Sequence, residues 1–461
     1  MTITARQVAA DVLHRSREHQ GFAAELIDDA LTRGLTALGS PGLSSQDRRF
    51  VTQLVFGVMR RKGTLDALLK PFMRIPAHAV EPRVWDVLHL GAFQLAFLTQ
   101  VPKHAAVNET VELAIHIGSG KAKGFINSVM RRVAELVTDE FTDTPGADAI
   151  PFERLAASQR YRKLTRPILP DPIAEPAAHL AASHSWPLWL ASRWIEQFGA
   201  EECHRLGFWF NAPPPLWIRT NKRHNSRDEY RLRLAAQMID VEPGEHPQSL
   251  RLLESHSIRD LPGYDDGDFA VQDHSSMLPA SALSPQPGMR VLDLCSAPGG
   301  KTTHIAELMD NRGSITACDI DPKRLETVTA LCQRMKIKCV ETVALKEFQE
   351  PPPGPFDAAL VDVPCSNTGV LGRRPEVRWR LKPGEFEYLI RLQTKLLFWA
   401  VERVKPKGVI VYSTCSIEPG ENAGVVNAVM RGYRGLTLEA EHTSIPGEPS
   451  DGGYWARLRK T

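Results

Sequence analysis

Apolar residues recur at helical spacing throughout the first 137 residues. Along the segment 47–69, these residues fall on one helical face: Phe50, Leu54, Val58, Leu65 and Leu68. The segment 85–98 is apolar on almost every side, which indicates a central, buried helix. Because no alternating pattern interrupts this region, the sequence predicts a compact helical bundle over residues 1–137.

This periodicity is lost between residues 138 and 185, where proline, acidic residues and alanine are frequent. We interpret 138–185 as a long, partly extended linker with room for a short helix around Phe152–Tyr161.

The helical periodicity of apolar residues returns at Trp186. An amphipathic helix over 187–198, two further helices, a strand after Pro215 and two short strand-like pieces then predict a small α+β unit over 186–275.

From about residue 286, short apolar runs alternate with helical patterns, which is typical of a doubly wound parallel sheet. The expected strands are 291–294, 314–319, 338–343, 358–362 and 409–413, and the expected helices are 301–309, 322–335, 386–403 and 421–431. Ligands of such sheets bind beyond the carboxyl ends of the strands. The residues that follow each strand are therefore the candidates for chemistry.

A glycine turn follows the first of these strands, in the sequence VLDLCSAPGGK (291–301). A strand, a glycine turn and a helix start leave unpaired backbone N–H groups that suit a polar or anionic ligand, although a plain connection is the simpler alternative. The next strand ends at Asp319, nineteen residues beyond Gly300, an offset that suits hydrogen bonds to ribose hydroxyls. A helix-capping role before Pro322 is the alternative. The spacing is neither GxGxxG nor that of a P-loop, and it suits S-adenosylmethionine better than NAD.

The length, charge and cysteine content of the chain limit the kinds of protein that it can be. The chain has 461 residues, enough for several domains, and a formal net charge of +2, so any nucleic-acid binding must come from local patches. The seven cysteines are odd in number and form no CxxC, which favours reduced thiols in the cytoplasm and argues against a structural metal site. Neither a secretory signal nor a membrane-spanning stretch is present, so we expect a cytoplasmic protein with no membrane association.

Two cysteines, Cys365 and Cys415, come just after neighbouring strands of the predicted sheet. Either one alone is most simply a small buried apolar residue. Together they suit a reaction that needs a thiol, because carbon 5 of cytosine accepts a methyl group only after a thiolate has added to carbon 6. Asp362, at the end of the same strand as Cys365, is placed to stabilise the charge that develops near N3 of the ring.

Four motifs in order, DLCSAPGGKT, DIDPKRL, DVPCSNTGVLGRRPEVRW and YSTCS, resemble those of the RNA cytosine-5 methyltransferase family, the NOL/NOP/Sun group. The N-terminal stretches LSSQDRRFVTQLVFGVMRRKGTLD and AVNETVELA resemble the NusB-like RNA-binding domain of the branch that acts on small-subunit rRNA. The resemblance implies a NusB-like all-α domain (1–137), the linker (138–185), a small α+β RNA-binding subdomain (186–275) and a Rossmann-like, S-adenosylmethionine-dependent catalytic domain (276–461). It also implies 16S rRNA as the substrate and excludes DNA. We further expect a monomer.

The resemblance assigns roles to individual residues. Cys415 is the nucleophile, Cys365 assists release of the methylated RNA, and Asp362 is the active-site acid that also borders the cofactor. Lys301 belongs to both the catalytic set and the cofactor loop. The other cofactor residues are Cys295, Ser296, Ala297, Pro298, Gly299, Gly300 and Asp319. DNA cytosine-5 methyltransferases use the cysteine of a Pro-Cys motif, so Cys365 is the alternative nucleophile.

The chain departs from the family pattern after the third strand, where an Asp usually contacts the adenine side of the cofactor. Here the stretch reads Glu341-Thr342-Val343-Ala344-Leu345. A second departure is the segment QDHSSM at 272–277. The missing Asp supports one alternative, a non-catalytic rRNA-binding or assembly factor on a methyltransferase scaffold. Another alternative is an enzyme of the same chemistry that acts on tRNA or large-subunit rRNA.

Arginines recur at predicted helix ends and loops, and a solvated surface is the default explanation for each of them. Grouped on one side they would form a phosphate-contacting face. The predicted RNA contacts are Arg48, Arg49, Arg60, Arg61, Arg219, Arg223, Arg373 and Arg374.

Overall fold

The computed structural model describes residues 3–18, 22–33, 43–73, 75–155, 158–254, 256–447 and 449–461. The chain forms two compact units. One unit contains residues up to Pro213 together with Leu371–Arg380, and the other contains Pro214–Val370 and Leu381–Thr461. The chain therefore passes from one unit to the other three times.

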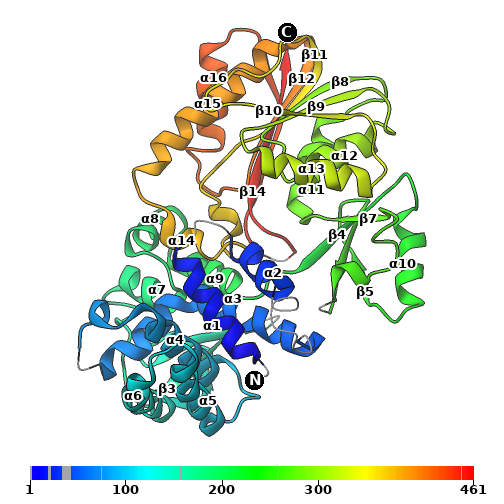
Figure 1. Cartoon of the computed structure of the whole chain (residues 1–461). Helices are drawn as coiled ribbons and strands as arrows, with labels where there is room; N and C mark the ends of the chain where they lie inside the picture. Colours follow the sequence, from blue (N-terminus) through cyan, green and yellow to red (C-terminus); the bar gives the residue numbers. More distant parts are fainter. Residues whose placement is uncertain are drawn as a thin grey trace. The chain divides into compact units, whose positions relative to one another are not determined.

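The first unit begins with a helical bundle, as predicted (Figure 1). Its helices are α1 (Ala5–Glu18), α2 (Ala23–Arg33), α3 (Ser45–Leu69), α4 (Pro82–Phe97), α5 (Lys103–His116) and α6 (Lys123–Leu136). Ser44 starts α3 through a capping box, because its side chain accepts a hydrogen bond from the Asp47 N–H while Asp47 accepts one from the Ser44 N–H. Helix α4 is buried over almost its whole length and forms the centre of the bundle.

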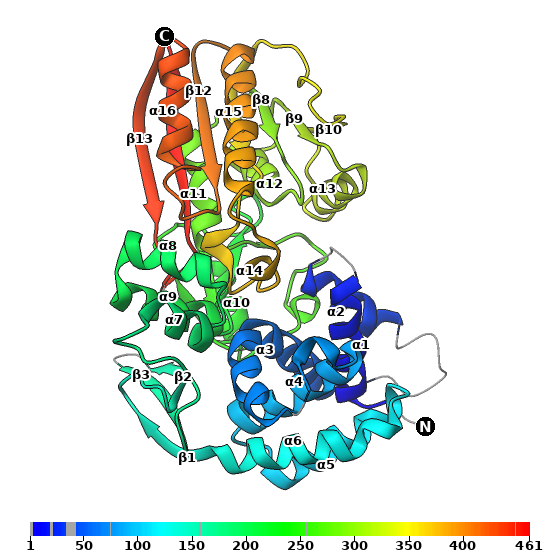
Figure 2. The same ribbon diagram turned by 90° about the vertical axis from the view of Figure 1, so that its left-hand side faces the viewer.

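The segment predicted as an extended linker is folded. Strands β1 (Val137–Thr142), β2 (Ala149–Leu155) and β3 (Ser158–Leu164) form an antiparallel sheet in the order β1–β3–β2 (Figure 2). The short helix suggested around Phe152–Tyr161 is wrong, because these residues belong to the β2–β3 pair. Buried Arg162 of β3 donates hydrogen bonds to the carbonyl of Ala96 in α4 (3.0 Å) and to that of Thr138 in β1 (2.6 Å). Val137, Ile150 and Leu164 pack in the core of the bundle, so the sheet is held by polar and apolar contacts together.

Helices α7 (Pro176–His184), α8 (Leu188–Phe198) and α9 (Ala200–Asn211) follow, and α14 (Val377–Arg380) joins the same unit from far along the chain. Arg378 is fully buried and donates to the carbonyls of Arg60 (2.9 Å), His184 (3.2 Å) and Phe210 (2.6 Å) and to the side chain of Asn211 (2.8 Å). Burial is the main cause that lowers the pKa of Arg378 to about 9. Carbonyl oxygens thus replace water around a cation inside the unit.

The second unit begins with a four-stranded antiparallel sheet in the order β5–β6–β4–β7. Its strands are β4 (Leu216–Thr220), β5 (Val241–Pro243), β6 (Ser249–Leu252) and β7 (Phe269–Val271), with α10 (Arg227–Ala235) between β4 and β5. This confirms the predicted small α+β architecture, although helices α8 and α9 belong to the first unit.

A seven-stranded sheet completes the second unit, in the order β10–β9–β8–β11–β12–β14–β13 (Figure 1). The strands are β8 (Arg290–Leu294), β9 (Ser314–Asp319), β10 (Val340–Ala344), β11 (Phe356–Asp362), β12 (Val404–Thr414), β13 (Leu436–Ser444) and β14 (Gly453–Lys460). The sheet is parallel as far as β12, as predicted, but β14 runs antiparallel to both of its neighbours. The sheet is therefore mixed, and the sequence did not indicate its two last strands.

Helices cover both faces of this sheet (Figure 2). Helices α15 (Glu385–Arg403) and α16 (Ala423–Gly432) pack on one face, while α11 (His274–Leu283), α12 (Gly300–Leu308) and α13 (Pro322–Arg334) pack on the other. Alternate residues of each central strand face the two layers: Leu292 and Leu294 of β8 enter the first core, and Val291 enters the second. Burial on both faces explains the continuous apolar runs in the sequence.

A buried ion pair joins the small sheet of the second unit to helix α12, which packs on the large sheet. Arg219 of β4 and Glu307 of α12 are both fully buried and lie 2.6 Å apart. Burial raises the pKa of the Glu307 carboxyl even though Arg219 acts in the opposite direction. Arg219 also donates to the carbonyl of Gly300 (2.9 Å), at the start of α12. Arg219 is therefore a structural residue, and the prediction that it contacts RNA is wrong.

We expect Arg219→Met to destabilise the second unit by about 3–5 kcal/mol, because Glu307 would remain as a buried charge without its cation. The measurement is the shift of the chemical denaturation curve. The double variant Arg219→Met with Glu307→Gln is the control, and it should lose less than the single variant. A single-variant loss below about 1 kcal/mol would contradict this account of the pair.

Candidate active site

The carboxyl ends of four adjacent strands, β9, β8, β11 and β12, meet at one edge of the large sheet. Each is followed by residues singled out from the sequence: Asp319 ends β9, the glycine turn follows β8, and the two cysteines follow β11 and β12. Parallel strands carry their following loops to the same edge, so the topology brings these segments together.

The glycine turn between β8 and α12 is held by backbone contacts and by Asp319. The Ala297 N–H donates to one oxygen of Asp319 (3.1 Å), and the Ser296 N–H donates to the carbonyl of Cys318 (2.9 Å). Gly299 has a φ of 101°, and a Cβ there would lie 3.1 Å from the backbone of Val328. The turn therefore needs glycine at this position. It presents the first N–H groups of α12 at the sheet edge.

A carboxylate that the sequence analysis did not single out lies beneath the turn. Asp293 of β8 is fully buried, and one of its oxygens accepts a hydrogen bond from the Thr302 hydroxyl (2.6 Å). Burial, assisted by Asp362 and Asp319, raises its pKa to about 7. The sequence did contain a sign of this residue, because Asp293 lies inside the apolar run VLDL, and an uncompensated charge is rare inside a buried strand.

Asp362, at the end of β11, forms an ion pair with Lys301 of α12, with 2.7 Å between Oδ2 and Nζ. Its other oxygen accepts a hydrogen bond from the Ser413 hydroxyl (2.7 Å). Burial alone would lower the pKa of Lys301, but the charge and hydrogen bond of Asp362 outweigh burial and raise it. Lys301 therefore carries a positive charge beside the acid.

The two sequence-predicted thiols touch. The Sγ atoms of Cys365 and Cys415 lie 3.2 Å apart, and Cys415 Sγ also lies 3.2 Å from the amide oxygen of Asn367. The contact with Cys415, followed by burial, raises the pKa of Cys365 well above its usual range. Cys365 is thereby kept as a neutral thiol. Cys415 is half-buried, and Cys365 is only 8% exposed.

The remaining cysteines are packed within the fold. Cys203, Cys318 and Cys332 are buried, and Cys339 is half-buried. Burial, reinforced by nearby carboxylates, raises the pKa of Cys295 in the glycine turn. Cys295 is therefore a poor nucleophile despite its place at the sheet edge.

Glu421 connects the loops that carry the two thiols. This carboxylate is fully buried just before α16. It accepts hydrogen bonds from the Ser366 N–H (2.9 Å), the Ser366 hydroxyl, the Ser416 hydroxyl (2.5 Å) and the Gln393 amide (2.8 Å). Ser366 follows Cys365 and Ser416 follows Cys415, so a single side chain fixes both loops. The sequence analysis placed Glu421 at the start of a helix and missed this role.

The end of the third strand provides no acid at the expected place. Glu341 lies inside β10, paired with Thr316 of β9, and is exposed. The first residue after the strand is Leu345, whose N–H donates to the carbonyl of Asp319 (2.9 Å). Glu341 therefore does not take the position at the strand end that the family pattern gives to an Asp.

Several arginines predicted to contact RNA are occupied inside the protein. Arg60 is buried and donates to the Gly372 carbonyl (2.8 Å), and buried Arg61 donates to the Phe152 carbonyl (2.8 Å). These two predictions are wrong for the same reason as that for Arg219. Arg49 is exposed, while Arg48, Arg223, Arg373 and Arg374 are half-buried, with the Arg374 guanidinium 4.3 Å from the centre of the Phe22 ring.

Across the described ranges, no group of three or more His, Cys, Asp or Glu side chains is arranged to hold a metal ion. Among the same residues, no helix is long and apolar enough to cross a membrane.

Three known protein families match successive parts of the sequence. The family described as 16S rRNA methyltransferase RsmB/F matches residues 280–448, the NusB family matches residues 3–135, and a ferredoxin-like domain described as RsmF/B-like matches residues 186–259. These matches confirm the predicted fold class of each part.

Individual relatives match over nearly the whole chain. A Synechocystis protein named probable ribosomal RNA small subunit methyltransferase B is 34% identical, and the match covers 97% of this chain and 93% of that protein. Ribosomal RNA small subunit methyltransferase B of Klebsiella pneumoniae is 31% identical over 96% of this chain and 98% of its own length. A solved structure of a methyltransferase homolog from Pyrococcus horikoshii has a TM-score of 0.54 at 26% identity, over 61% of this chain and 98% of that one. The chain therefore belongs to the RsmB/F family of 16S rRNA methyltransferases.

Proposed function

We propose that this protein methylates carbon 5 of a cytosine in small-subunit rRNA, with S-adenosylmethionine as the methyl donor and Cys415 as the nucleophile. The observation that carries the proposal is the pair of thiols in contact at 3.2 Å, at the same sheet edge as the Lys301–Asp362 ion pair. Relatives named ribosomal RNA small subunit methyltransferase B support the choice of RNA.

The residues present fit the methyl donor. The glycine turn offers the free N–H groups of the first turn of α12, and the buried Ser296 hydroxyl has no hydrogen-bond partner among the residues that the structure describes. These groups would hold the amino-acid end of the donor, and Asp319 would hold its ribose hydroxyls. When bound, the donor supplies an electrophilic methyl group. The first residue beyond β10 is Leu345, so no carboxylate stands at that position to meet the adenine.

The reaction begins with addition of the Cys415 thiolate to carbon 6 of the cytosine, which forms a C–S bond and moves an electron pair to carbon 5. Lys301 and Asp362, the latter also held by Ser413, would pass a proton to N3 that balances the electron pair received by the ring, and the Asp362 carboxylate would then stabilise the protonated N3. Carbon 5 then takes the methyl group. A base removes the carbon 5 proton, the electron pair returns to the ring, and the C–S bond breaks to release Cys415.

The pKa of Cys365 supports its role in product release over the role of nucleophile. A thiol whose pKa is raised by its neighbour and by burial is a poor attacking group but retains a proton at neutral pH. Cys365 would return that proton to Cys415 as the adduct breaks down.

Replacing either thiol should separate the two roles. We expect Cys415→Ala to abolish methyl transfer to rRNA, and we expect Cys365→Ala to accumulate a covalent RNA–protein adduct because release is blocked. Labelled donor measures transfer, and a gel shift in denaturant measures the adduct. The matched control is Cys332→Ala, a buried thiol in α13 that should leave both readouts unchanged. Full transfer by Cys415→Ala would overturn the assignment.

A second test concerns the positioning of the thiols. Glu421→Gln places an N–H₂ group among donors that need an acceptor, so the Ser366 and Ser416 loops should shift. We expect the rate of methyl transfer to fall about 100-fold. Adduct formation in the Cys365→Ala background should slow in parallel, while the affinity for S-adenosylmethionine, measured by calorimetry, should stay unchanged. A rate within threefold of the parent would rule out this role.

The scaffold alternative predicts no binding of S-adenosylmethionine at millimolar concentration, and the missing acid after β10 remains its support. The alternatives with tRNA or large-subunit rRNA as substrate predict methylation of those RNAs in the same assay. Bisulfite sequencing of rRNA from a deletion strain would identify the modified cytosine.

A further inference from the structure

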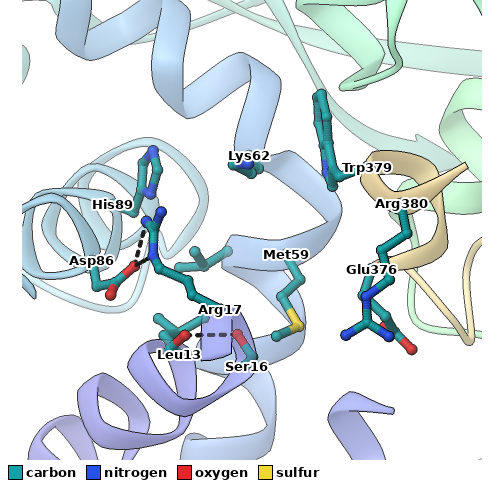
Figure 3. Close-up of a pocket in the computed structure, with 11 residues that line it drawn as sticks. Leu13, Ser16, Arg17, Met59, Lys62, Asp86, His89, Glu376, Trp379 and Arg380 are labelled. Carbon is teal, nitrogen blue, oxygen red and sulfur yellow. Dashed lines mark hydrogen bonds and ion pairs between the residues drawn. The ribbon is translucent and has the colours of Figure 1, made fainter. Parts of the chain in front are cut away.

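The loop that follows Cys365 has two parts that belong to different units. Residues 371–380 are part of the first unit, where Glu376, Trp379 and Arg380 help to line a cavity of about 220 Å³ (Figure 3). The residues up to Val370 are part of the second unit, together with both reactive thiols. Within this earlier part of the loop, Asn367 contacts both Cys365 and Cys415.

The backbone of Asn367 is left-handed, with a φ of 57°. Residues with a side chain rarely adopt this conformation, and asparagine is one of the few that tolerate it. Such a conformation persists where the surrounding structure fixes it. Here the Gly369 N–H donates to the carbonyl of Cys415 (3.0 Å), and the Ile417 N–H donates to the Thr368 hydroxyl (3.1 Å). The loop around Asn367 is thus tied to the loop around Cys415.

The side-chain amide of Asn367 links the two cysteines. Its Nδ2 group donates to the backbone carbonyl of Cys365 (2.8 Å), and its Oδ1 atom accepts from the Cys415 thiol (3.2 Å). Because the backbone carbonyl can only accept, it fixes which end of the amide faces Cys415. An amide oxygen also can only accept, so Cys415 supplies the proton of the second hydrogen bond.

The contact between the two sulfur atoms then has a definite direction. Each thiol has one proton, and that of Cys415 points to Asn367. The Cys365 thiol therefore donates to Cys415 across the 3.2 Å between the Sγ atoms. The contact with Cys415, followed by burial, raises the pKa of Cys365, while a hydrogen bond from the Asn367 backbone N–H acts in the opposite direction. The hydrogen bonds thus form a ring that begins and ends at Asn367.

Ionisable side chains from several elements surround the two thiols, and they include Lys301, Asp362, Tyr412 and Glu421. Burial lowers the pKa of Lys301, but Asp362 and, to a smaller extent, Cys415 raise it. The Lys301 ammonium in turn favours a thiolate at Cys415. The Cys365 S–H also favours this thiolate, whereas the Asn367 oxygen favours the protonated thiol.

We propose that Asn367 is a positioning residue that sets the direction of the hydrogen bond between the two thiols, so that Cys415 attacks the base and Cys365 keeps its proton. Cys415 is half-buried, so it can lose its proton to solvent. The resulting thiolate still accepts from Cys365 and is held in one place. The proposal rests on the proposed function for the roles of the thiols in methyl transfer, whereas the direction of the hydrogen bond can be measured without RNA.

Alkylation by iodoacetamide across a range of pH, in the full-length protein without RNA or methyl donor, measures the thiolate fraction of Cys415. The two cysteines are followed separately by mass spectrometry, because Arg373 and Lys407 place them in different tryptic peptides. Asn367→Gly removes the amide and tolerates the left-handed backbone. We expect the pH midpoint of Cys415 alkylation to fall by about 0.5–1 pH unit, because the protonated thiol loses its acceptor. An unchanged or higher midpoint would overturn the proposal.

Two further variants test the direction of the hydrogen bonds. Asn367→Asp places a negative charge beside Cys415 and should raise the midpoint by about one pH unit. Cys365→Ala removes the donor to the thiolate and should also raise the midpoint, whereas a fall would show that Cys415 donates to Cys365 and would overturn the proposal. A merely structural role for Asn367 would shift the Gly and Asp variants in the same direction, which would also overturn it.

Asn311→Gly is the matched control. Asn311 has the same φ of 57°, precedes β9 and accepts hydrogen bonds from the backbone N–H groups of Lys338 and Cys339. We expect this variant to keep the parent's midpoint, which ties the shift at position 367 to the contact with Cys415 and not to the left-handed backbone. A fall equal to that of Asn367→Gly would contradict the proposal.

Methyl transfer tests the consequence for catalysis. Asn367→Gly should lower kcat about tenfold even though more thiolate is present, because the sulfur is no longer held in one place. The affinity for S-adenosylmethionine, measured by calorimetry, should stay within twofold. A kcat at or above that of the parent would overturn the positioning role. If the parent itself transfers no methyl group, the proposed function fails, while the shifts in alkylation still decide the direction of the hydrogen bonds.

Discussion

The buried carboxylate of Glu421 is the constraint on which the thiol pair depends. A charge without water is costly, and here four hydrogen-bond donors compensate it. Two of those donors belong to Ser366 and one to Ser416, so the cost of burial is met only when both cysteine loops are in place. The positions of the two cysteine loops are therefore set when the protein folds, before any substrate binds.

The large sheet supplies the other half of this geometry. Strands β11 and β12 are parallel neighbours in which Asp362 pairs with Ser413. Cys365 and Cys415 follow that pair by three and two residues, so residues fifty positions apart in the sequence come into contact. Strand β8 lies on the other side of β11 and brings the glycine turn and Lys301 to the same acid. Adjacent strand ends thus place the glycine turn beside Asp362 and the two thiols.

The sequence was most informative where burial and periodicity coincide. The parallel strands, the helices between them and the glycine turn were predicted because apolar runs and turn residues mark them directly. The sheet at 137–164 was not predicted, because its few buried apolar residues, Val137, Ile150 and Leu164, stand among polar ones and form no clear alternation. The same difficulty affects the arginines Arg60, Arg61 and Arg219. The sequence shows that an arginine is present, but it does not show whether water, phosphate or backbone carbonyls surround its guanidinium. Asp293 and Glu421 were missed because single acids in a sequence resemble solvated ones.

The ten residues Leu371–Arg380 belong to the first unit, although the chain on both sides of them belongs to the second. Arg378 satisfies carbonyls of Arg60, His184 and Phe210, which stand far earlier in the sequence. A fragment that ends at residue 213 would lose this cation and leave a buried gap among those carbonyls. A fragment that begins at residue 214 would carry the same ten residues without the surface that folds them. A single cut of the chain therefore cannot separate the two units with each one intact.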